Sequence, residues 1–162
     1  MNFTKKFFAL FVLVLLIIFQ PNAQASYPDH LNGDPDYVCT DGHMGAGWYM
    51  KKSSLNVESY SPPIYVISVS VYTVNDADRG NTNYTKVETF RFRYDWDNRS
   101  MYVQTRDKDW NYSWRYLDPN GSWAKTGISM PTGEMAFYVA YRQKFYGQFY
   151  GRYDSKFYAR AD

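Results

Sequence analysis

The segment 85–105, TKVETFRFRYDWDNRSMYVQT, decides the fold of this chain. Its aromatic residues fall on every second position from 90 to 96, with polar or charged residues between them. Because successive side chains of a β-strand point to opposite faces, this alternation predicts a strand with one aromatic and one charged face. Asp97-Asn98-Arg99-Ser100 has the composition of a turn, so residues 101–105 are expected to return as a second strand. The aromatic face of this hairpin then needs a cover from elsewhere in the chain.

The surrounding sequence supplies partner strands and one helix. Residues 64–74 form the longest β-prone run, and shorter runs at 47–50, 55–59 and 110–116 indicate further strands. A helix is expected from Thr132, as N-cap, to Gly147, as C-terminal stop, with Glu134 in its first turn. The sequence therefore predicts an α+β fold: an antiparallel β-sheet of about five or six strands with one C-terminal helix packed on it.

The chain divides into four parts. Residues 1–25 have the pattern of a signal peptide: a basic pair, an apolar run at 7–19 and Ala23-Gln24-Ala25 before the expected cleavage site. The run is too short to span a bilayer as a helix, although an uncleaved N-terminal anchor is an alternative. Residues 26–46 are expected to form an irregular N-terminal arm, 47–147 the sheet-and-helix domain, and 148–162 an aromatic-rich C-terminal tail.

Charge and cysteine content exclude some classes of protein. Without Lys5 and Lys6 of the expected signal peptide, the 18 basic residues fall to 16, which balance the 16 acidic residues. A neutral chain lacks the basic field of a nucleic-acid-binding protein, so no nucleic acid is expected as a partner. Cys39 is the one cysteine, so no intramolecular disulfide can form. We expect Cys39 to be a buried apolar residue; an exposed thiol or a link between chains are the alternatives.

Aromatic residues are the outstanding feature of the composition, with 17 Tyr, 11 Phe and 5 Trp. Such side chains serve strand packing and binding surfaces alike. In the tail, a cation or amide precedes an aromatic pair repeatedly, a pattern that can dock on membranes, glycans or nucleic acid; packing on the domain or a disordered end are the alternatives. The candidate ligand-binding residues are Tyr146, Tyr150, Tyr153, Tyr158, Trp110 and Trp114.

No catalytic, metal-ligating or cofactor-binding motif is present, so we expect no catalytic residues, no metal and no cofactor. The acidic residues after Asp34 lack the glycine and glutamate spacing of a calcium loop. Cys39 and His43 could form a nucleophile–base pair, but their spacing does not indicate a third, orienting group. Carboxylates such as Glu88 and Glu134 could meet as a glycosidase pair, which leaves a small secreted hydrolase as an alternative.

Four motifs together resemble small exported bacterial proteins of the surface-adhesin protein E group. They are Trp48 through Ser54, Tyr65 to Val74, Arg91 through Ser100 with Tyr94-Asp95, and Met130-Pro131-Thr132-Gly133-Glu134, within residues 47–146. The chain is also similar to uncharacterised secreted proteins of anaerobic Negativicutes-type bacteria. Members of the adhesin group usually carry a cysteine pair that ties the sheet to the last helix, and this chain has no cysteine there. The resemblance implies an antiparallel sheet with a C-terminal helix, an envelope location and no enzymatic activity.

These observations lead to a functional expectation. We expect an exported protein, periplasmic, cell-surface or extracellular, that binds a glycan or protein at a cell surface and has no catalytic activity. The secreted hydrolase and a purely structural envelope component remain the alternatives. We expect no stable transmembrane span after cleavage, and the sequence leaves the oligomeric state open.

Overall fold

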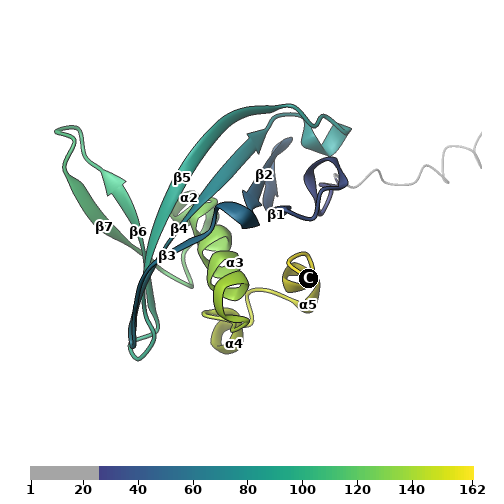
Figure 1. Cartoon of the computed structure of the whole chain (residues 1–162). Coiled ribbons are helices and arrows are strands. Elements are labelled where there is room, and N and C mark those ends of the chain that lie inside the picture. The colour runs from purple at the N-terminus through teal and green to yellow at the C-terminus, as the bar shows by residue number, and fades with distance from the viewer. Residues whose placement is uncertain (1–25) are drawn as a thin grey trace, which may run out of the picture.

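The computed structural model describes residues 26–162, so the expected signal peptide lies outside the described residues. A seven-stranded antiparallel sheet is ordered β1-β2-β4-β5-β6-β7, with β3 also paired to β4, and helix α3 crosses one face (Figure 1). The strands are β1 (Tyr37–His43), β2 (Ala46–Lys51), β3 (Asn56–Ser61), β4 (Ile64–Val74), β5 (Tyr84–Asp95), β6 (Ser100–Arg106) and β7 (Tyr112–Leu117). The helices are η1 (Leu31–Gly33), η2 (Lys52–Ser54), η3 (Ala77–Arg79), α2 (Trp123–Thr126), α3 (Ser129–Tyr141), α4 (Gly147–Tyr150) and α5 (Ser155–Ala159). The predicted α+β class is confirmed.

Strands β2 and β3 lie end to end along one edge of β4. β2 pairs with residues 71–74 and β3 with residues 64–68, and η2 joins the two at the break predicted from the sequence. The Ser54 hydroxyl accepts a hydrogen bond from the backbone N–H of Ser70 at 2.9 Å, at the gap between β2 and β3 where this edge of β4 has no strand partner. The Ser54 side chain thus supplies the hydrogen bond that a neighbouring strand would otherwise make, because backbone N–H groups away from water need an acceptor.

The aromatic face of β5 is the centre of the core, as predicted. Phe92 and Tyr94 are fully buried, and Tyr94 lies 4.8 Å from Phe137 of α3 between ring centroids. Trp96 stacks on the same Phe137 ring at 5.5 Å with an interplanar angle of 15°. Burial of aromatic rings at this density supplies most of the apolar area that stabilises a small domain.

Helix α3 differs from its predicted position because packing, not capping, fixes it. It begins at Ser129 and has Pro131 in its first turn, where the missing N–H costs nothing. Thr132 is buried inside the helix and shares a hydrogen bond with the Thr40 hydroxyl at 3.2 Å, so it is not the N-cap. The helix ends at Arg142 in the left-handed conformation, and Gly147 begins α4 instead of ending α3.

The expected irregular arm and the tail are both folded onto the domain. The arm contains β1, which pairs with β2 throughout its length. The tail contains α5, and its Phe157, Tyr158 and Ala161 belong to the main core. Sequence periodicity gave little sign of β1 because glycine and polar residues interrupt its alternation at 40–43.

Glu134 connects α3 to residues 145–147 and to Tyr158 of the tail. This carboxylate is fully buried in α3, where Oε1 accepts from the N–H of Phe145 at 2.9 Å and from the Tyr158 hydroxyl at 2.7 Å. Oε1 also accepts from the N–H of Gly147 at 3.1 Å, and Oε2 from the N–H of Tyr146 at 2.7 Å. Four donors on one carboxylate compensate for its desolvation and satisfy the backbone that leads into α4.

Three buried tyrosine hydroxyls connect the same layers. Tyr94 donates to the carbonyl of Gly133 at 2.8 Å, and Tyr146 donates to the carbonyl of Leu117 at 2.9 Å. Burial raises the pKa of Tyr94, Tyr146 and Tyr158 above the ordinary value near 10, and the Glu134 carboxylate raises the pKa of Tyr94 and Tyr158 further. The folded chain therefore holds all three phenols in their neutral form.

Glu134→Gln is expected to lower the free energy of unfolding by about 2–4 kcal/mol. The substitution replaces one acceptor oxygen by an NH₂ group, which is a donor and would face the N–H or O–H donors that now bind the carboxylate. Urea unfolding followed by circular dichroism measures the change. Glu88→Gln is the matched control: Glu88 is partly exposed and paired only with Lys86, so its loss should cost at most about 0.5 kcal/mol. Equal effects of the two substitutions would contradict this role for Glu134.

Alkaline pH is expected to unfold the protein through its buried phenols. Their folded pKa values are raised, so their stabilising contribution is complete below the unfolded tyrosine pKa near 10 and is lost as pH rises above it. Each buried phenol removes about 1.4 kcal/mol of stability per pH unit in that range. Absorbance of tyrosinate near 295 nm should show a class of tyrosines that ionises only when circular dichroism reports unfolding. Ionisation of every tyrosine near pH 10 with the fold intact would refute the assignment.

Candidate functional site

The β6–β7 hairpin leaves the sheet and projects from the body (Figure 1). It pairs with β5 only between Phe92–Asp95 and Ser100–Val103, and beyond these pairs the two strands diverge. β6 and β7 remain paired with each other from Met101–Leu117 to Arg106–Tyr112. The hairpin thus has a base anchored in the sheet and a tip surrounded by solvent.

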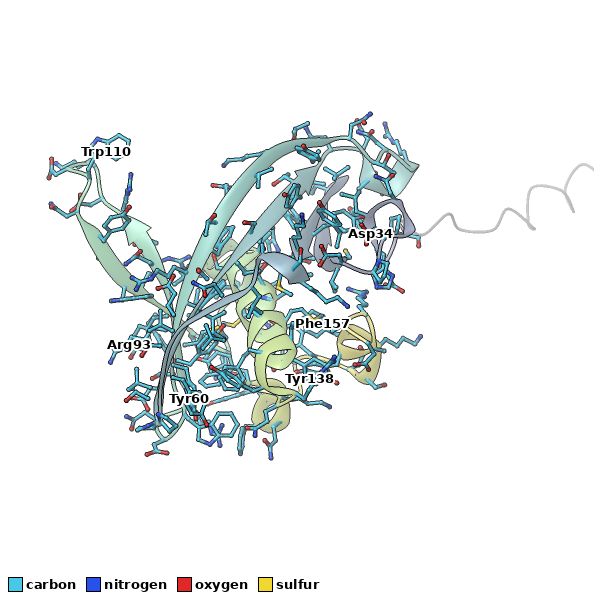
Figure 2. The ribbon with its side chains drawn as sticks, in the orientation of Figure 1. Asp34, Tyr60, Arg93, Trp110, Tyr138 and Phe157 are labelled. Carbon is cyan, nitrogen blue, oxygen red and sulfur yellow. The ribbon has the colours of Figure 1, made fainter. Side chains whose placement is uncertain are left out.

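The tip loop is tightly ordered by Asp107. Its Oδ1 accepts from the N–H groups of Asp109 at 2.9 Å and Asn111 at 2.8 Å, and its own N–H donates to the carbonyl of Asn111 at 3.0 Å. Trp110 occupies the left-handed region with φ of 64°, an unfavourable conformation for a bulky residue. Its side chain is 74% exposed and lies at the far end of the hairpin (Figure 2).

Arg106 joins the aromatic side chains of the tip. Its guanidinium carbon lies 5.2 Å from the Trp110 ring centroid and 4.4 Å from that of Tyr112, and the guanidinium also donates to the Tyr112 hydroxyl. We call these three residues the tip cluster. Cation–π contacts hold its rings in place while their outer surfaces stay exposed, so the cluster is ordered before any partner arrives.

The hairpin base is attached to the charged face of β5. Arg91 lies 5.4 Å from the Trp114 ring centroid and forms an ion pair with Glu58 of β3 at 2.5 Å. Arg93 lies 5.8 Å from the ring centroid of Tyr102 on β6. The charged positions predicted between the core aromatics therefore position the hairpin.

A wedge of about 510 Å³ opens where β5 and β6 diverge. Its lining is polar: Glu58, Ser68, Glu88, Thr89, Arg91, Gln104, Thr105, Arg106 and Tyr112. The tip cluster contributes two of these residues, so wedge and tip form one continuous surface.

A second cleft, of about 920 Å³, lies between the N-terminal arm, β1, the start of α3 and the tail. On one wall the Trp123 indole N–H donates to Asp41 Oδ2 at 2.7 Å, and His43 packs on the Trp123 ring at 4.2 Å. On the opposite wall Arg160 forms an ion pair with Asp29 at 2.8 Å. Asp41 and Asp29 are thus each already engaged by a partner within the fold.

The six candidate residues fall into separate environments. Trp110 and Trp114 lie on one hairpin, as expected, while Tyr150 is exposed on α4 and Tyr153 lines the 920 Å³ cleft and stacks on Phe157 at 4.3 Å. Tyr146 and Tyr158 are buried, which corrects their expected placement on a binding surface. The tail repeat does not stay on one face: the pairs Phe145-Tyr146 and Phe157-Tyr158 are buried, whereas Phe149 and Tyr150 of α4 are exposed.

Sequence reasoning missed Arg106, Tyr112 and Trp123. Tyr112 alternates with Trp110 and Trp114 in the sequence, which could have indicated it. No local pattern could have placed Trp123 beside Asp41, because 82 positions separate them.

The glutamates and the thiol considered as catalytic groups from the sequence are paired or buried. Glu134 is saturated by buried donors, and Glu58 and Glu88 are paired with Arg91 and Lys86. Burial raises the pKa of the Cys39 thiol to about 12, which suppresses the nucleophilic thiolate and agrees with the expected buried position. Between residues 26 and 162 no three His, Cys, Asp or Glu side chains gather closely enough to bind a metal ion.

Within the same range, no helix has the length and apolar character needed to cross a membrane. Comparison of the chain with protein-family models, with curated proteins and with solved structures finds no match.

Proposed function

We propose that this is an exported binding protein, without catalytic activity, that contacts a protein at a cell surface through the tip cluster. The observation that carries the proposal is the exposed, preorganised set of Trp110, Arg106 and Tyr112 on a projecting hairpin. Exposed Trp110 at a strained backbone position has no role in the core, and such outliers concentrate at binding sites.

The composition of the tip cluster favours a protein partner over a glycan. Trp, Tyr and Arg are the residue types that dominate binding energy at protein interfaces. Their rings are fixed by contacts within the chain, which reduces the conformational entropy lost on binding. Export to the cell envelope or the medium is inferred from the pattern of residues 1–25.

Two competing functions are separable by experiment. A secreted hydrolase would have to use the aspartates of the 920 Å³ cleft, such as Asp41, because each glutamate is already engaged. A purely structural envelope component would stay cell-associated without any contribution from the tip cluster.

Trp110→Ala and Tyr112→Ala are each expected to weaken retention on cells by about tenfold or more, the effect of losing an interface hot spot. Fractionation of producing cells, with quantification in medium, envelope and soluble fractions, measures retention directly. Tyr60→Ala is the matched control, because Tyr60 is 67% exposed on β3 and lies away from Trp110 (Figure 2).

Thermal unfolding of all three variants must first show that the fold survives. If both tip variants remain cell-associated to the same degree as Tyr60→Ala, the binding proposal is wrong and a structural role is favoured. Turnover of a glycan or peptide substrate that Asp41→Asn abolishes would replace the proposal with the hydrolase.

A further inference from the structure

The divergence of the β6–β7 hairpin leaves one edge of β5 open. Residues 84–91 pair with β4 on one side, but among the described residues no strand pairs with their other side. An open strand edge presents unpaired N–H and C=O groups and is a template for adding another strand.

The edges of β1 and β3 are less open than this one. The edge of β1 is covered by the arm, since the Cys39 N–H donates to the carbonyl of Asp29 at 2.9 Å and His30 forms a β-bridge with Val38. The register of β3 is broken by a bulge between Val57 and Ser59. Along β5 the ladder with β4 is regular from Lys86 to Arg91, and its register shift leaves Thr85 unpaired between the pairs Thr73–Lys86 and Val74–Tyr84.

The sequence along this edge is self-complementary about Val87. Residues 85–89 read Thr-Lys-Val-Glu-Thr, so reversal of the segment returns the same residue types except that Lys86 and Glu88 exchange places. Their side chains are 61% and 43% exposed, and Val87 between them is an exposed apolar residue. The segment therefore matches an antiparallel copy of itself in both charge and hydrophobicity.

We propose that a second copy of this chain docks antiparallel on the β5 edge, centred on Val87, so that the two sheets join into one. The inference does not depend on the proposed binding function. Antiparallel pairing of the two β5 edges is an isologous contact: each copy contributes the same surface, as twofold symmetry requires.

Symmetry restricts the register to those in which one residue is paired with its own copy. A twofold axis perpendicular to the joined sheet keeps α3 of both copies on one face, and residues opposite each other in an antiparallel pair share a face. The axis must then pass midway between one residue and the same residue of the second copy, and these two residues are paired. Centring on Lys86 or on Glu88 would set two like charges directly opposite each other, which is destabilising.

Centring on Val87 makes every pair favourable. Val87 meets the partner's Val87, and Lys86 meets the partner's Glu88 twice by symmetry, which extends the existing 2.8 Å ion pair into a network of four charges. The 510 Å³ wedge lies beside Glu88, Thr89 and Arg91, and gives the end of the added strand room to enter.

Charge exchange tests the pairing. Lys86→Glu and Glu88→Lys should each weaken dimerisation at least about tenfold, because each places like charges opposite one another twice. The double variant K86E/E88K restores opposite charges at both pairs and should recover dimerisation to about the original strength. Sedimentation velocity over a concentration series of the purified protein measures the equilibrium.

Arg79→Glu is the matched control, since Arg79 forms an exposed ion pair with Asp76 away from this edge and should leave dimerisation unchanged. Thermal unfolding at low concentration verifies that every variant folds. A protein that stays monomeric at all concentrations up to about 100 μM, well above the micromolar affinity of a weak specific complex, overturns the proposal. A dimer that both single variants leave intact also overturns it.

Disulfide trapping tests the register separately. Val87→Cys should cross-link two copies under mild oxidation, because opposite residues bring their Cβ atoms within reach of a disulfide. Thr85→Cys should not, because in a pairing centred on Val87 the two Thr85 positions lie about four residues apart along the strands. Cys39 is buried and should not interfere. A dimer that Thr85→Cys traps and Val87→Cys does not contradicts the Val87 register.

Discussion

The buried carboxylate of Glu134 is the constraint on which the rest of the structure depends. One side chain of α3 binds the backbone of 145–147 and the hydroxyl of Tyr158, so it connects the helix, the turn into α4 and the last helix of the chain. A charge buried in a domain of this size is tolerated only when donors surround it. Three of the donors belong to residues 145–147 and the fourth is Tyr158 of the tail, so both segments must pack against α3 for the carboxylate to be satisfied.

The aromatic face of β5 and its charged face have different roles. Phe92 and Tyr94 hold α3 against the sheet, whereas Arg91 and Arg93 reach aromatic rings of the β6–β7 hairpin on the other side. The hairpin therefore leaves the sheet at a defined place and remains attached at its base. Its departure creates both the exposed tip cluster and the open edge of β5, so one divergence of strands generates the two surfaces proposed for interaction. A dimer would carry two hairpins and could gain avidity at a surface.

Most of the sheet and the position of its core were predictable, while the site was predictable only in part. The alternation at 90–96 and the long run at 64–74 indicated the central strands because period-two burial leaves a strong local signal. The same reasoning placed Trp110 on a surface, where it is exposed, but also placed Tyr146 and Tyr158 there, although both are buried. An aromatic repeat has the same sequence pattern whether its side chains face solvent or the core. Helix α3 was found and its ends were misplaced, because Thr132 and Gly147 resemble capping residues but serve packing.

The sequence by itself determined the class of fold, the aromatic core face and the balance of charge, because these follow from composition and from periodicity along the chain. Tertiary structure decided which aromatics are exposed, where the hairpin leaves the sheet and what Glu134 binds. Those outcomes depend on contacts between residues far apart in the chain, such as Arg91 with Glu58 and Trp123 with Asp41. Only folding brings such groups into contact, and no local sequence pattern predicts these contacts.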